Sequence, residues 1–128
     1  MRLLADTHLL MWAVGPDELL PETARELMAD TQNELLFSVV SLWELAIKRS
    51  LRRTEAQLDP RVLRKELLDN GYKELAVISE HAFGVETLPL IHKDPFDRLL
   101  VAQAMVEGIT LLTSDPVVGR YPGPIQLV

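Results

Sequence analysis

The sequence contains no cysteine, which excludes disulfide bonds and thiolate metal sites and favours a reducing, cytoplasmic setting. No apolar run approaches the roughly 20 residues that cross a bilayer. An acid at position 6 interrupts the first apolar stretch, and no signal peptide is predicted. Positive charge is also scarce, because 13 Lys and Arg face 19 Asp and Glu, for a formal net charge of −6. This balance argues against a protein that coats nucleic acid by bulk charge, but not against an enzyme that grips it locally.

The composition that remains is typical of a globular domain, with 128 residues, 48% hydrophobic and 25% charged. We expect one domain over residues 1–128. Short apolar runs predict strands at 2–6, 34–40, 74–78, 109–115 and, at the sheet edge, 125–128. Helical patterns and start signals predict helices at 7–14, 21–32, 41–50, 59–72, from 79 onward for a short stretch, and at 95–108. Buried strands that alternate with helices indicate an α/β fold, a three-layer α/β/α sandwich with a mostly parallel central sheet.

Four acidic residues follow the expected strands in a way that places them at one edge of this sheet. Asp6 and Asp115 each end a strand, and Glu44 and Asp97 each fall in the first turn of a helix. Ligands of open α/β sheets bind beyond the carboxyl ends of the strands. Each acid also has a purely structural explanation. Asp6 and Asp115 suit caps, Glu44 completes a Ser41-x-x-Glu44 capping box, and Asp97 complements a helix dipole.

The segment "HKDPFDRLLVAQA" shows the same ambiguity within a few residues. Asp94 suits a helix cap, Pro95 suits the first helical position, and Asp97 lies in the first turn. The segment alone does not distinguish capping from catalysis, and we interpret Asp94 mainly as the cap.

Taken together, the four acids are better explained by a bound cation. Carboxylates held close together repel, and one of them commonly takes up a proton, whereas helix N-termini favour the ionised form. A hard divalent cation with oxygen ligands resolves this conflict. With no thiolate and only three histidines, the sequence predicts Mg²⁺, for which Mn²⁺ can substitute, rather than zinc.

Several motifs, in their order and spacing, resemble a PIN domain, and more narrowly the VapC-type ribonuclease toxins of bacterial toxin–antitoxin pairs. The motifs are "LLADTHLLMWAV", "SVVSLWELAIK", "HKDPFDRLLVAQA" and "LLTSD". The resemblance runs from Met1 to about Pro116. It implies that the metal-binding acids of the family fall on Asp6, Glu44, Asp97 and Asp115. It also places Thr113 at a polar position that helps to hold metal or water, and Asp94 at an acid usual in the subgroup.

The resemblance further implies a Mg²⁺-dependent endoribonuclease in which metal-activated water cleaves RNA. Asp6 and Asp97 would be direct ligands, Glu44 would complete the shell or orient the water, and Asp115 would support the site or hold a second metal. Transfer or ribosomal RNA is the substrate class of such toxins, a VapB-like antitoxin the inhibitor and a homodimer the assembly. We expect the apolar dimer surface on the N-terminal helices, at Leu9, Met11, Trp12 and Leu20.

Some positively charged and histidine residues are candidates for substrate binding. The segment "KRSLRR" places four cations in six residues, and either it is a solvated helix face or it grips an RNA backbone. The candidate substrate-binding residues are Lys48, Arg49, Arg52, Arg53, His92 and Arg98. His8 follows the first acid and either faces the cleft or is merely exposed, and His81 is expected at the surface.

Other function classes fit the same residues less well. A haloacid-dehalogenase-type phosphatase would have Asp-x-Asp after the first strand, where His8 stands instead. A phosphorelay receiver would have an acid pair there and a lysine late in the sheet, and neither is evident. Two alternatives stay open: a catalytically weak PIN-like interaction module, against which the intact acid set argues, and a non-toxin PIN nuclease of RNA processing.

Overall fold

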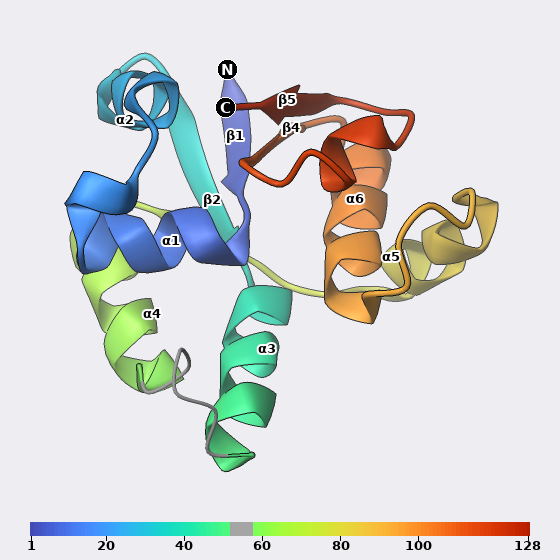
Figure 1. Ribbon diagram of the computed structural model, residues 1–128, viewed down its shortest axis with the longest axis horizontal. Helices are drawn as coiled ribbons and strands as arrows, with labels where there is room; N and C mark the ends of the chain where they lie inside the picture. Colours follow the sequence, from blue (N-terminus) through green and yellow to red (C-terminus); the bar gives the residue numbers. More distant parts are fainter. Residues whose placement is uncertain (52–57) are drawn as a thin grey trace.

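A five-stranded sheet forms the centre of the computed structural model, which describes residues 1–51 and 58–128 (Figure 1). Its strands are β1 (Arg2–Ala5), β2 (Glu34–Ser38), β3 (Lys73–Leu75), β4 (Thr110–Thr113) and β5 (Ile125–Leu127). They lie in the order β3-β2-β1-β4-β5, and every pair is parallel. The predicted α/β sandwich is therefore confirmed, with a sheet that is wholly parallel over these residues.

Helices cover both faces of the sheet (Figure 1). The α-helices are α1 (Thr7–Val14), α2 (Glu22–Ala29), α3 (Val39–Ser50), α4 (Pro60–Asp69), α5 (Ser79–Gly84) and α6 (Pro95–Glu107). Short 3₁₀ turns are η1 (Asp17–Leu19), η3 (Val85–Thr87) and η4 (Val118–Arg120). Helices α1, α2 and α4 lie on one side and α5 and α6 on the other, whereas α3 continues beyond the carboxyl end of β2.

Alternation along β1 divides the core into two layers. Leu3 and Ala5 pack in the cluster that contains residues of α1, α2 and α4, and Leu4 packs in the cluster that contains residues of α6. All three side chains are buried. Burial of a leucine side chain contributes about 1.5–3 kcal/mol. The apolar positions of the central strands therefore hold both helix layers against the sheet and fix the edge at which the acids lie.

The start of α3 differs from the prediction. β2 ends at Ser38, whose Oγ accepts a hydrogen bond from the Val40 amide at 2.9 Å and caps the helix. Ser41 is thus already inside the helix, and Glu44 lies in its second turn. The predicted capping box of Ser41 and Glu44 is wrong, because Ser38 already provides the cap. Glu44 is left available for another role.

Other boundaries are shorter than predicted because caps and turns end the elements. The β3 strand stops at Leu75 instead of 78, and α2 stops at Ala29. Helix α4 ends at Asp69, with Asn70 as its C-cap and Gly71 at a φ of 86°, a left-handed conformation that favours glycine. At the other end of the chain, β4 stops at Thr113, so Asp115 lies in the loop beyond it. No helix in the described part of the chain is long and apolar enough to traverse a membrane.

Three residues lie deeper than the sequence suggested. His81, expected at the surface, is fully buried where α5 packs against α6. Its Nδ1 accepts from the Ile78 amide, and its Nε2 lies 2.7 Å from Oε2 of Glu107. Leu9 and Leu20, expected on an exposed dimer surface, belong to the core, and only Met11 and Trp12 of that set are half-buried. The apolar surface predicted at the N-terminal helices is therefore wrong for Leu9 and Leu20.

Candidate active site

The four acids predicted from the sequence lie around one cavity at the carboxyl edge of the sheet. The cavity measures about 130 Å³. It is lined by Asp6, Thr7, His8, Glu44, Lys48, His92, Asp94, Asp97 and Asp115. Its walls come from the ends of β1 and β4 and from α3 and α6, so the fold gathers residues that are more than 100 positions apart in the sequence.

Asp6 is both a helix cap and a wall of this cavity. Its Oδ1 accepts from the Leu9 amide at 3.0 Å and caps α1, and its Oδ2 accepts from Oγ1 of Thr113 at 2.6 Å. The residue is only 7% exposed. Burial raises the pKa of Asp6, and the hydrogen bonds from Thr113 and Leu9 partly offset this effect. The structural and functional interpretations of this acid are therefore compatible.

Thr113 connects the two acids that follow β1 and β4. Its hydroxyl donates to Asp6 and accepts from the Asp115 amide at 3.1 Å. Asp115 in turn uses Oδ1 to accept from the Val117 amide at 2.8 Å. Its other oxygen, Oδ2, faces His92 at 4.0 Å across the cavity. One carboxylate oxygen of Asp115 thus fixes the loop and the other faces the site.

Glu44 is 4% exposed and is held by Thr7, which the sequence did not single out, and by Lys48, a predicted substrate-binding residue. Its Oε1 accepts from Oγ1 of Thr7 at 2.8 Å, and Thr7 also lies 2.9 Å from Oγ of Ser41. Its Oε2 lies 2.6 Å from Nζ of Lys48, one helical turn further along α3. The sequence signal for Thr7 was its place after the acid at the end of the first strand. Ser41, predicted to cap the helix, instead contacts Thr7.

Asp94 caps α6 as predicted, because its Oδ1 accepts from the amides of Phe96 at 2.8 Å and Asp97 at 3.3 Å. Asp97 stands in the first turn of α6. Burial raises the pKa of Asp97 to about 7, and repulsion from four neighbouring acids, Asp94 first, adds to this shift. Without a cation the cluster therefore retains a proton near neutral pH. A divalent ion relieves the same repulsion, and the carboxylate oxygens are ligands that suit Mg²⁺ or Mn²⁺.

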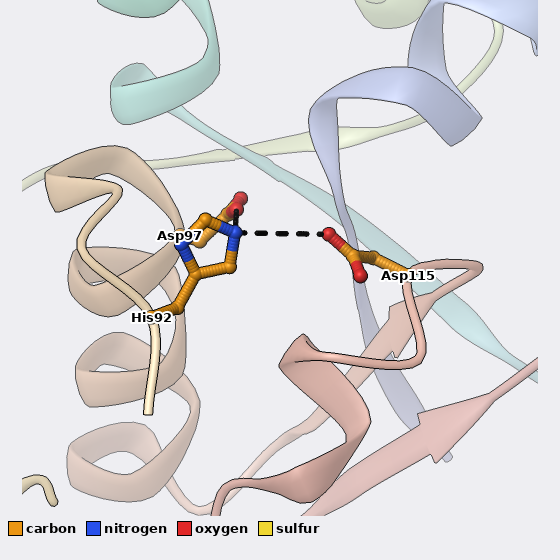
Figure 2. A group of neighbouring side chains, drawn as sticks. All are labelled: His92, Asp97 and Asp115. Atoms are coloured by element: carbon orange, nitrogen blue, oxygen red, sulfur yellow. Dashed lines mark ion pairs between the residues drawn. The ribbon is translucent and has the colours of Figure 1, made fainter. Parts of the chain in front are cut away.

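The histidine before α6 completes one side of the cavity. One ring nitrogen of His92 faces the carboxylates of both Asp97 and Asp115 (Figure 2). This nitrogen, Nε2, lies 3.7 Å from Oδ2 of Asp97 and 4.0 Å from Oδ2 of Asp115. His92, Asp97 and Asp115 each offer one atom that could bind a metal, and these three atoms lie within 4.8 Å of one another.

The remaining predicted substrate-binding residues lie in different surroundings. Lys48 lines the cavity beside Glu44, whereas Arg49 pairs with Asp59 at 3.2 Å. The guanidinium of Arg98 donates to the carbonyls of Pro89 and Val85 and to the hydroxyl of Tyr121, which are structural contacts. Arg52 and Arg53 lie outside the described residues.

A larger apolar cavity of about 380 Å³ adjoins the acidic one and shares His8, Glu44 and Lys48 with it. Its other lining residues are Met11, Trp12, Val14, Gly15, Pro16, Leu19, Leu45 and Leu58. A ligand that reached into both cavities would combine apolar contacts with charged ones.

Comparisons with known proteins agree with this fold. A chain in the crystal structure of VapBC2 from Rickettsia felis, bound to a DNA fragment from their promoter, has a TM-score of 0.72 at 18% identity and covers 99% of this chain and 98% of that one. A chain of DNA-bound VapBC from Salmonella typhimurium has a TM-score of 0.65 at 18% identity, covering 98% and 97%. A chain of VapBC-5 from Mycobacterium tuberculosis has a TM-score of 0.59 at 16% identity and covers 99% of this chain and 97% of that one.

At these identities the likeness shows a shared fold. No curated protein sequence matches the chain. The family model described as PIN domain matches residues 3–124, nearly the whole sequence, and this chain therefore belongs to the PIN domain family.

Proposed function

We propose that this protein is a cytoplasmic, metal-dependent endoribonuclease of the VapC type, the toxin of a toxin–antitoxin pair. The observation that carries the proposal is the convergence of Asp6, Glu44, Asp97 and Asp115 on one cavity within a PIN domain. The VapBC chains with the same fold add support.

In this proposal Asp6 and Asp97 hold Mg²⁺ or Mn²⁺ directly. The bound cation supplies an activated water and stabilises the leaving oxygen of a phosphodiester. Thr113 orients Asp6 through its 2.6 Å hydrogen bond, and Thr7 orients Glu44. Asp115 keeps one carboxylate oxygen free toward the cavity for further coordination.

Lys48 is the cation best placed to contact the RNA backbone. It lines the acidic cavity, and its side chain is partly exposed while it pairs with Glu44. If Glu44 helped to hold the metal, the Lys48 ammonium would be available to a phosphate oxygen. Arg49 and Arg98 are engaged elsewhere, and we assign them no substrate contact.

We further propose inhibition by a VapB-like antitoxin. The apolar cavity suits a leucine- or phenylalanine-sized side chain of a peptide, and the acidic cavity beside it suits an arginine, which binds carboxylates through two hydrogen bonds. Such a peptide would compete with the metal and with RNA. The structural neighbours that are VapBC complexes support this assignment of the partner.

The proposed assembly is a homodimer. Trp43 and Ile47 of α3 and its C-cap residue Leu51 follow one another at intervals of four residues, and these side chains are 49%, 39% and 60% exposed. Trp43 also packs edge-to-face on Phe96 of α6, with ring centroids 4.9 Å apart. An apolar stripe of this kind on a small domain favours burial against a second copy.

The test is cleavage of RNA by the purified protein with Mg²⁺, compared with Asp6→Asn and Asp97→Asn. We expect cleavage by the wild type only. A wild type that is folded and binds a basic peptide but cuts no RNA would support the alternative of an interaction module.

A further inference from the structure

The loop that carries His92 is held by one hydroxyl group. Oη of Tyr121 accepts from the His92 amide at 2.8 Å and donates to the His92 carbonyl at 3.1 Å. Arg98 donates to the same hydroxyl at 3.2 Å and to the carbonyl of Pro89 at 2.9 Å. The backbone of His92 is thus fixed on both sides, and its ring is presented to the cavity from a defined position.

A second contact selects the tautomer of the ring. Nδ1 of His92 accepts a hydrogen bond from the Asp94 amide at 3.0 Å, and an acceptor nitrogen carries no hydrogen. The neutral ring therefore has its hydrogen on Nε2, the atom that faces Asp97 and Asp115 (Figure 2). At 3.7 and 4.0 Å both carboxylates are beyond hydrogen-bonding distance, and within the described residues Nε2 makes no hydrogen bond.

This arrangement is unsuited to a metal ligand, although His92, Asp97 and Asp115 have the spacing of one. A histidine that binds metal does so through a bare nitrogen and donates the hydrogen of its other nitrogen to a neighbour. Here the other nitrogen is occupied by a backbone donor. If Nε2 bound a metal, the ring hydrogen would have to move to Nδ1. There it would face the hydrogen of the Asp94 amide, and the hydrogen bond between them would be lost.

The same tautomer also excludes a role as the base that activates water, because Nε2 already carries a hydrogen. Nε2 of His92 can instead donate a hydrogen bond. An oxygen that accepts from Nε2 here lies beside two carboxylates, which repel a negative charge. A phosphate oxygen fits this place best, because a cation bound at the acids would offset that repulsion.

We propose that His92 does not coordinate the metal but donates its Nε2 hydrogen to a non-bridging oxygen of the scissile phosphate. Tyr121 is the positioning residue that fixes His92. This inference rests on the proposed nuclease function and adds a substrate-binding residue to it.

Metal affinity separates a donor from a ligand without any activity measurement. We would titrate Mn²⁺ into wild type, His92→Ala and Asp97→Asn by calorimetry. The inference predicts that His92→Ala changes the affinity less than threefold, whereas Asp97→Asn weakens it more than tenfold. Loss of tenfold or more in His92→Ala would make His92 a ligand and overturn the inference. Imidazole ¹⁵N shifts of His92 that report a hydrogen on Nε2, with and without Mg²⁺, are the second expected result.

Substrate affinity tests the phosphate contact. The probe is a fluorescein-labelled single-stranded oligoribonucleotide, measured by anisotropy with Ca²⁺ in place of Mg²⁺ to slow cleavage. We expect His92→Ala to weaken binding about tenfold, as loss of a hydrogen bond to a charged group does. His92→Gln should restore much of it, because the Gln amide donates from the position of Nε2. His92→Asn, whose amide corresponds to Nδ1, should not.

The role of Tyr121 is tested in the same assay. Tyr121→Phe should weaken RNA binding by less than His92→Ala does. In the variant that carries both substitutions, Tyr121→Phe should cause no further loss, since both residues act through the contact of His92 with the phosphate. Equal binding by wild type and His92→Ala would overturn the inference. If the wild type itself did not bind RNA, the proposed function would fail, and the phosphate contact with it, whereas the Mn²⁺ titration and the ¹⁵N shifts would still decide whether His92 is a ligand.

Discussion

Oγ1 of Thr113 lies 2.6 Å from Oδ2 of Asp6, although the two residues are 107 positions apart. The contact joins the carboxyl ends of β4 and β1, which are neighbouring strands of the sheet. Because Thr113 also accepts from the Asp115 amide, a single hydroxyl sets the positions of two acids. The geometry of the candidate site is thus tied to the register of the central strands.

Thr113→Val should weaken both folding and metal binding. The substitution keeps the shape of a fully buried side chain but removes the donor to Asp6 and the acceptor of the Asp115 amide. We expect a loss of about 1–3 kcal/mol in the free energy of unfolding by urea, together with weaker Mn²⁺ binding. Thr113→Ser retains the hydroxyl and serves as the control. Mn²⁺ affinity equal to that of the wild type in Thr113→Val would contradict a supporting role.

The stability of the metal-free protein should depend on pH through Asp97. Its pKa rises from 3.8 to about 7 on folding, so between these values the folded state binds more protons than the unfolded state. The stabilisation of the folded state by the protonated Asp97 is fully present below about pH 4 and is lost as the pH rises to about 7. Asp97→Asn lacks this titration and should gain stability relative to wild type between pH 5 and pH 8 in EDTA. Urea unfolding at both pH values measures the difference, and a constant difference would refute the shift.

The affinity for Mn²⁺ should fall below neutral pH for the same reason. A cation that binds Asp97 must displace the proton that the carboxyl holds below about pH 7. We expect about a tenfold loss of affinity for each pH unit below that value, with release of close to one proton seen by calorimetry in buffers of different ionisation enthalpy. An affinity that is constant from pH 7 to pH 5 would mean that the metal binds away from Asp97.

The stripe of Trp43, Ile47 and Leu51, along α3 and its C-cap, gives a test of the dimer. Ile47→Asp places a charge in the middle of an exposed apolar surface, so it should yield a folded monomer at concentrations where wild type sediments as a dimer. The matched control is Val62→Asp on α4, at a residue that is 52% exposed and outside the stripe. A wild type that is monomeric at micromolar concentration would remove the homodimer from the proposal.

Much of the acid cluster could be predicted because several of its acids have a local signature in the sequence. Asp6 follows an apolar run, and Asp94 precedes a proline and caps the helix of Asp97, as the structure shows. The α/β order followed from strands that are apolar on both faces. These features depend on residues close together in the sequence.

The remaining contacts depend on partners that are distant in the sequence. Ser38, not Ser41, caps α3, because β2 ends at Ser38, and Glu44 in the second turn accepts a hydrogen bond from Thr7, 37 residues away. His81 is buried because α5 packs against α6 and brings Glu107 to its ring. No local pattern predicts such pairs, since they form only when the sheet has been assembled.

End-group analysis of the cleavage products tests the central claim most directly. In the proposed function, a cation held by the acids of the cavity would make hydroxide from water, and attack by water would leave a 5′-phosphate and a 3′-hydroxyl. We predict these ends on a labelled oligoribonucleotide and no cleavage in excess EDTA. An oligonucleotide with a 2′-O-methyl group at the cleavage site should still be cut if it binds. A 2′,3′-cyclic phosphate would show that the RNA 2′-hydroxyl is the nucleophile, and full activity in EDTA would show that no bound cation is needed. Either result would contradict the claim that the acids carry the reaction.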